Sequence, residues 1–134
     1  MIRVENWDEF NDFSHHEFDD GGPEMSFEFM FMLQQARNIA RDTDPNIIFH
    51  INSGSRSIEQ NQQVGGKPNS SHLEGVACDI RTGDSRTSFV VVKSLLLAGF
   101  TRIGVIQYKQ IFVHVDGADF IAGVVNKKSS NVMW

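Results

Sequence analysis

Two histidines and one aspartate are the residues of this chain whose types and spacing indicate chemistry. His72 stands seven residues before Asp79, and His114 follows in a later apolar run. Imidazole nitrogen and carboxylate oxygen both bind zinc, and three protein ligands with one open position form the pattern of a catalytic zinc site. A water in that position reaches a pKa of about 7, so hydroxide is available at neutral pH. The trio predicts a zinc hydrolase, although such residues also occur singly as ordinary polar groups.

The sequence around these residues indicates two strands that present them together. Residues 76–80 are typical of a short strand, in which Asp79 points to the opposite face from the flanking apolar side chains. Residues 111–115 form a second β-type run, in which a buried histidine needs a hydrogen-bonding partner. His114 and Asp116 share one face of that strand. We therefore expect both strands to contribute polar groups to one site.

The same segments carry a family resemblance. The pattern S-x-H-x-x-G-x-A-x-D-I over residues 70–80, followed by H-x-D at 114–116, resembles the M15 zinc peptidases. These include D-alanyl-D-alanine carboxypeptidases and peptidoglycan endopeptidases such as phage endolysins, and they share a metal-site fold with the Hedgehog signalling domain. Further similar segments follow one another along most of the chain, at residues 13–18, 52–57, 61, 64–66 and 99–104.

The resemblance implies a zinc metallopeptidase that hydrolyses peptide bonds in peptidoglycan stem peptides. The implied activity is that of a D-Ala-D-Ala carboxypeptidase or an endolysin-like endopeptidase in phage-type lysis of the cell wall. His72, Asp79 and His114 are then the Zn²⁺ ligands. Arg56, in a Ser-Gly-x-Arg segment, is implied to bind a carboxylate or carbonyl of the substrate, the alternative being a surface salt bridge. Ser70 is expected to bond near the metal or orient His72, or to be a plain turn serine.

One departure from the family concerns proton transfer. M15 enzymes carry Glu or Asp three residues before the last histidine ligand, and here that residue is Ile111. Asp116 is the best substitute as the catalytic acid–base group, because it shares a strand face with His114. It can instead accept a hydrogen bond from His114 or cap the turn at Gly117, and Glu74 is a second candidate. The departure leaves an alternative function open, a catalytically weak zinc-binding module with a structural or virion-assembly role.

Composition is that of an ordinary globular chain and excludes some function classes. With 134 residues and 40% apolar content, we expect a single domain over residues 1–134. A net charge of −5 argues against nucleic-acid binding. Cys78 has no partner for a disulfide and is expected in the core. No secretion signal or membrane-spanning run is present, so we expect synthesis in the cytoplasm and action on the wall after lysis or from a virion. The oligomeric state, monomer included, is left open.

Apolar periodicity predicts an α+β fold, a mixed and largely antiparallel sheet with two main helices. The resemblance to the M15 peptidases implies that this fold is of the Hedgehog/DD-peptidase type. The helices are expected at 24–41 and 88–98, the second with Phe89 and Leu96 among its inward residues. A short helix is expected at 58–62. Besides the two ligand strands, strands are expected at 46–51, 102–106 and 131–134, the first being buried and carrying His50.

Overall fold

A computed structural model describes residues 1–134 and confirms the predicted α+β fold. Its main sheet has five strands in the order β2–β4–β6–β5–β7, and only the β5–β7 pair is parallel. In chain order these strands are β2 (His50–Ser53), β4 (Ala77–Arg81), β5 (Arg102–Tyr108), β6 (Gln110–Asp116) and β7 (Val132–Met133).

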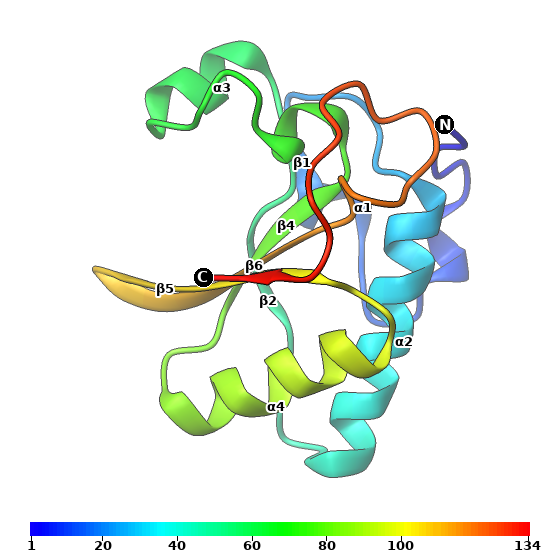
Figure 1. Cartoon of the computed structure of the whole chain (residues 1–134). Coiled ribbons are helices and arrows are strands. Elements are labelled where there is room, and N and C mark those ends of the chain that lie inside the picture. Colours follow the sequence, from blue (N-terminus) through cyan, green and yellow to red (C-terminus); the bar gives the residue numbers. More distant parts are fainter.

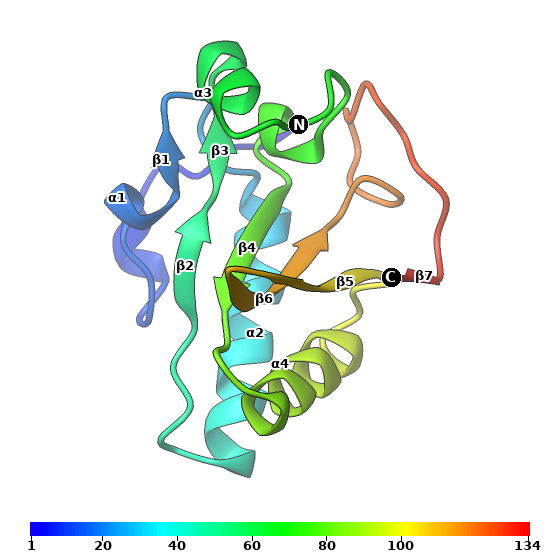
Figure 2. The same ribbon diagram turned by 90° about the vertical axis from the view of Figure 1, so that its left-hand side faces the viewer.

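The two long helices, α2 (Phe27–Thr43) and α4 (Ser85–Leu97), pack against each other and against one face of the sheet (Figures 1 and 2). On that face, Ile80 of β4 and Val113 of β6 are fully buried among the apolar side chains of the core. Because side chains alternate along a strand, Asp79 and His114 point to the other face. The β4–β6 register pairs these two residues directly. The core thus fixes the sheet on one side and leaves the other side free for a site.

Short elements gather at one end of the sheet. They are the 3-10 helix η1 (Trp7–Glu9), α1 (His15–Phe18), β1 (Asp19–Asp20), β3 (Ser55–Arg56), α3 (Ile58–Gln63) and the 3-10 helix η2 (Ser71–Glu74). β1 and β3 form a small parallel pair, and the short helix predicted at 58–62 is confirmed as α3. η2 ends three residues before β4 begins, so His72 lies just before the strand that carries Asp79.

The first long helix begins later than predicted because of its cap. The Ser26 hydroxyl accepts a hydrogen bond from the Phe29 amide, while the Ser26 amide donates to Gly75. The helix continues to Thr43 because the Asp44 amide still reaches the Ala40 carbonyl. No helix of the structure combines the length and the apolar character needed to cross a bilayer.

The inward face predicted for the second long helix is partly wrong. Phe89 is 67% exposed and Leu96 is 48% exposed, whereas Val91 is fully buried. The reason is that two serines occupy the buried face. Ser88 donates to the Asp84 carbonyl, and Ser94 donates to the Val90 carbonyl at 2.7 Å. A hydroxyl bonded to its own helix is satisfied without water, so a serine can lie on the buried face of the helix.

The prediction of a buried strand over 46–51 is wrong in its start and in the burial of His50. Regular pairing with β4 begins only at His50, whose side chain is exposed. Ile47 and Phe49 are buried without belonging to a strand. Because successive side chains along an extended chain point to opposite faces, His50 points away from the core side on which Phe49 is buried.

Candidate metal centre and its cavity

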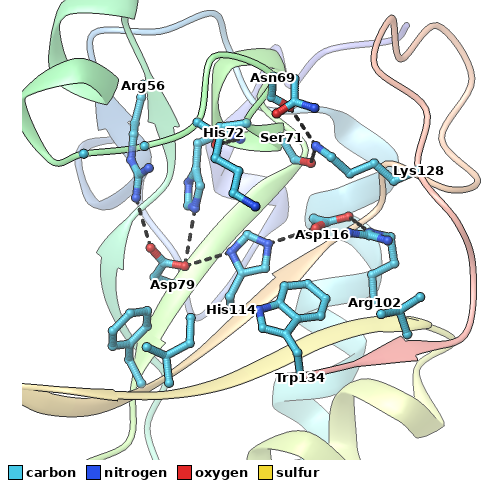
Figure 3. A pocket seen from close by; sticks show the side chains of 17 residues that line it. Arg56, Asn69, Ser71, His72, Asp79, Arg102, His114, Asp116, Lys128 and Trp134 are labelled. Atoms are coloured by element: carbon cyan, nitrogen blue, oxygen red, sulfur yellow. Dashed lines mark hydrogen bonds and ion pairs between the residues drawn. The ribbon is translucent and has the colours of Figure 1, made fainter.

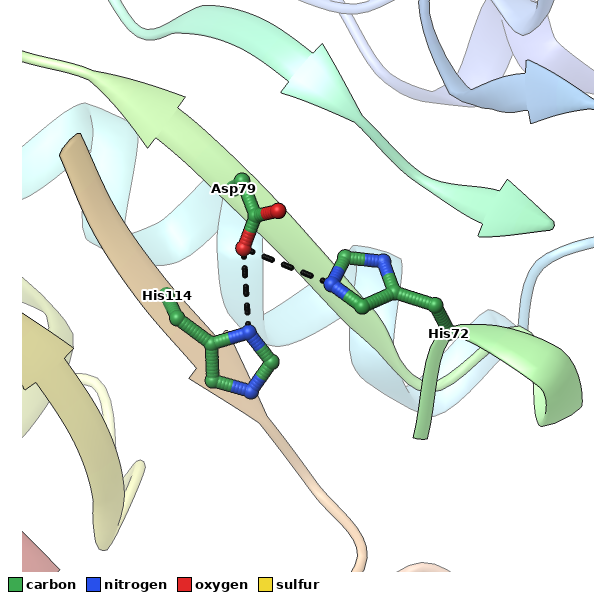
Figure 4. A group of neighbouring side chains, drawn as sticks. All are labelled: His72, Asp79 and His114. Carbon is green, nitrogen blue, oxygen red and sulfur yellow. Dashed lines mark hydrogen bonds and ion pairs between the residues drawn. The ribbon is translucent and has the colours of Figure 1, made fainter. Parts of the chain in front are cut away.

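The three predicted ligands converge in space although they come from three elements. His72 of η2, Asp79 of β4 and His114 of β6 each offer one ligand atom, and these atoms all lie within 4.8 Å of one another. Asp79 Oδ1 lies 3.3 Å from His72 Nε2 and 3.0 Å from His114 Nδ1 (Figure 4). Two imidazoles and a carboxylate therefore point at one position.

Local backbone geometry places His72. The Ser70 hydroxyl accepts a hydrogen bond from the His72 amide at 3.2 Å and thereby caps η2. Gly75 ends the turn with φ +70°, a conformation that L side chains rarely adopt, and a Cβ there would lie 2.7 Å from the Glu24 carbonyl oxygen. Ser70 thus acts on the turn that carries His72, through its backbone.

Each imidazole is oriented by a hydrogen bond on its far nitrogen. His72 Nδ1 donates to the Gly54 carbonyl at 2.7 Å, which leaves Nε2 facing the cluster. His114 Nε2 donates to Asp116 Oδ2 at 2.8 Å, which leaves Nδ1 facing Asp79. Acceptors of this kind fix the tautomer of a metal-binding histidine and raise its basicity. The donor set therefore fits a zinc ion.

The electrostatics of the cluster favour a cation. Burial acts to raise the pKa of Asp79, but hydrogen bonds from His114 and His72 outweigh it and hold the pKa well below its usual range. Burial acts to lower the pKa of His114, but its bonds to Asp116 and Asp79 raise it to about 9. His114 thus lies between two carboxylates, and a metal that binds Nδ1 replaces a proton there.

Arg56 makes three contacts with the surrounding protein. Its guanidinium donates to Asp79 Oδ2 at 3.1 Å, to the Ser53 hydroxyl at 2.9 Å and to Asn61 Oδ1 at 3.3 Å. The two oxygens of Asp79 therefore have different partners. Oδ2 contacts Arg56, and Oδ1 faces the two histidines. The arginine holds the carboxylate in the orientation that a metal ligand needs.

A cavity of about 640 Å³ opens over the cluster, and all six predicted site residues line it (Figure 3). The sequence analysis missed further lining residues with functional side chains, namely Lys67, Asn69, Arg102, Lys128 and Trp134.

Trp134 forms a wall of the cavity beside His114. The ring centroids of Trp134 and His114 lie 5.6 Å apart, and the Arg102 guanidinium lies 5.4 Å from the Trp134 ring centroid. Gly104, which pairs with His114 in the sheet, makes room for this ring, because a Cβ there would lie 2.5 Å from Trp134 Nε1. A glycine inside a strand is a sequence signal for such a close approach.

The two carboxylates considered for proton transfer are both engaged. Asp116 is 1% exposed, and besides His114 it accepts hydrogen bonds from Arg102 Nε at 2.8 Å and from the Ala118 amide at 3.1 Å. Glu74 accepts from the amides of Val125 and Asn126 and does not line the cavity. The geometry favours the role of Asp116 as the partner of His114.

A comparison with protein families matches residues 13–116 of the chain to the model described as Peptidase M15. The match covers more than half of the chain and includes all six predicted site residues, but neither Lys128 nor Trp134. No curated protein matches the chain.

Proposed function

Because the chain belongs to the peptidase M15 family, we propose that it is a zinc-dependent peptidase that cuts peptide bonds in the stem peptides of peptidoglycan. Family membership implies a peptidase with a peptide substrate. The observation that carries the proposal is the convergence of His72, Asp79 and His114 at the base of an open cavity. Within this class, we propose a D-Ala-D-Ala carboxypeptidase or an endolysin-like endopeptidase, released by phage lysis or carried in a virion.

In such a site, the two histidines and Asp79 would hold the zinc ion. When bound, zinc lowers the pKa of a water ligand to about 7 and polarises a carbonyl oxygen. His72 and His114 bind through the nitrogens that Gly54 and Asp116 leave facing the cluster. Asp79 would hold the zinc through Oδ1, because Oδ2 is the oxygen that contacts Arg56.

Asp116 acts through His114 in this proposal and is a positioning residue. It is 1% exposed, and its carboxylate already accepts three hydrogen bonds inside the protein, one of them from His114, which favours this role over proton transfer to a substrate. Arg56 has two N–H groups beyond its three protein contacts and lines the cavity. We propose that it contacts a substrate carbonyl, while Ser70 lies at the cavity wall and maintains the turn of His72.

Release of new amino groups from purified peptidoglycan tests the proposal. We would compare the zinc-loaded protein with His72→Ala and with His50→Ala, a control that removes an exposed histidine that does not line the cavity. Amine release by the unaltered protein and by His50→Ala, but not by His72→Ala, supports the peptidase. Bound zinc without amine release from any wall type would refute the peptidase and favour the alternative, a zinc-binding structural module. The observation that favours this alternative is that Asp116 and Glu74 both accept hydrogen bonds inside the protein.

A further inference from the structure

The cavity is cationic although the chain as a whole is acidic, with a net charge of −5. Besides histidines, its charged lining residues are Arg56, Lys67, Arg102 and Lys128 against Asp79 and Asp116. Each carboxylate is paired with one arginine, Asp79 with Arg56 at 3.1 Å and Asp116 with Arg102 at 2.8 Å. Neither lysine forms an ion pair. The unneutralised charge of the cavity therefore resides on Lys67 and Lys128.

Lys128 holds its ammonium group at a fixed place on the cavity wall. Its Nζ donates to the Asn69 carbonyl at 2.7 Å and to the Ser71 hydroxyl at 2.9 Å. An ammonium has three N–H donors, so one is left for a ligand. Ser71 immediately precedes His72. Figure 3 shows the Lys128 ammonium beside Ser71, on the side of the cavity where Asp116 lies and away from Arg56.

The segment that carries Lys128 is itself tied to the site. The Lys128 amide donates to the Ala118 carbonyl at 3.2 Å, and Arg102 donates to the Ser129 carbonyl at 2.7 Å. Glu74 accepts the Asn126 amide from the same segment. The position of the ammonium is thus built into the fold, which reduces the entropy lost when a ligand binds.

An anion beside Lys128 would relieve an electrostatic cost. Burial lowers the pKa of Lys128 from its ordinary value, Asp116 acts to raise it, and Arg102 lowers it further. Arg56 is in the opposite situation, because its charge is already paired with Asp79 and its guanidinium also donates to Ser53 and Asn61.

We infer that Lys128 binds a carboxylate of the substrate peptide, with Lys67 adding attraction at the exposed edge of the cavity. The inference rests on the proposed peptidase function and narrows its substrate to peptides that carry a free carboxylate close to the scissile bond. Lys128 lies beyond the residues that match the M15 family model, so this contact belongs to the chain's own C-terminal segment.

Binding of a synthetic stem peptide whose scissile amide is replaced by a non-hydrolysable isostere tests this inference. The zinc-loaded protein would be titrated in a calorimeter with the peptide carrying free carboxylates and with the same peptide fully amidated. A charge-assisted hydrogen bond is worth about 1.5–3 kcal/mol, so the free-acid form should bind roughly 10-fold to 100-fold more tightly. Lys128→Met should abolish this preference and leave the affinity for the amidated peptide within about twofold, whereas Lys128→Arg should retain most of it.

Lys127→Met is the matched control, since it removes the same charge from the next residue, which does not line the cavity. It should keep the preference for the free acid. Loss of the preference in Lys127→Met to the same extent, or its persistence in Lys128→Met, would overturn the inference. If Lys128 had only a structural role, Lys128→Met would weaken the binding of both peptides equally, and that result would also overturn the inference.

The outcome is separable from that of the proposed function, because binding is measured without turnover. Selective binding that depends on Lys128, in a protein that releases no amine, would keep the inference and refute the peptidase. Cleavage of both peptide forms with equal KM would support the peptidase and overturn the inference.

Discussion

Replacing Asp116 by Asn reverses the direction of one hydrogen bond at His114. Asn keeps an oxygen for Arg102 and Ala118, but it places an NH₂ group where Oδ2 now lies 2.8 Å from His114 Nε2. Nε2 must then accept rather than donate, so the proton of the neutral ring moves to Nδ1. Nδ1 is the nitrogen that faces Asp79 and the metal position. The substitution should therefore weaken zinc binding without changing any ligand.

The size of the effect follows from the role of such partners. Removing the hydrogen-bond acceptor behind a metal-binding histidine costs about 10-fold to 100-fold in metal affinity. That range corresponds to roughly 1.4–2.8 kcal/mol. Competition between the protein and a chromogenic zinc chelator at neutral pH measures the Kd. We expect the Kd of Asp116→Asn to rise by this factor, while turnover at saturating zinc falls much less.

Asp119→Asn is the control, because this nearby carboxylate accepts a hydrogen bond from Thr101 and does not line the cavity. Its zinc affinity should equal that of the unaltered protein. The reasoning is refuted if Asp116→Asn binds zinc with unchanged affinity but loses turnover at saturating zinc. That result would assign Asp116 to proton transfer, the catalytic role that the sequence suggested.

In chelator-treated protein, urea denaturation should show stability falling from about pH 6.5 to 9. The hydrogen bonds to Asp116 and Asp79 raise the pKa of His114 to about 9 in the folded protein, against an ordinary 6.5. Its contribution to the free energy of unfolding is therefore fully present below pH 6.5 and is lost as the pH rises to 9. A stability that does not change over this pH range would contradict this. Phe29→Ala should cost about 3–5 kcal/mol of unfolding free energy, whereas Phe89→Ala, at an exposed site, should cost under about 1 kcal/mol. Equal costs would contradict the assigned face of α4. Trp134→Ala should raise the peptide KM severalfold and leave the zinc Kd unchanged. A changed zinc Kd with an unchanged KM would argue against contact between Trp134 and the substrate.

Much of the fold follows from periodicity, because strand alternation and apolar content decide which face of a strand is buried. Asp79 between Cys78 and Ile80 was predicted to point away from the core, and both neighbours are fully buried. Periodicity failed in α4, where Ser88 and Ser94 lie on the buried face with their hydroxyls bonded inside the helix. A polar residue that satisfies itself locally cannot be distinguished from a solvent-facing one by type alone.

The candidate site was predictable where residue type and local strand pattern coincide, as at Asp79 and His114. His72 lies in η2 outside any strand and was predicted from the motif that precedes β4. The C-terminal wall was not predictable, because Lys128 lies in a segment without periodic pattern and reaches the cavity only through long-range contacts such as Lys128–Asn69. The partners of Arg56 were equally inaccessible, since its contact with Asp79 joins residues 23 positions apart.

We propose that His72, Asp79 and His114 together hold one zinc ion. Elemental analysis of purified protein after zinc loading and removal of excess metal tests it most directly, with His72→Ala and His50→Ala measured in parallel. We expect one zinc per chain in the unaltered protein and in His50→Ala, and a large loss of zinc in His72→Ala. An unaltered, folded protein that retains no more zinc than His72→Ala would contradict it.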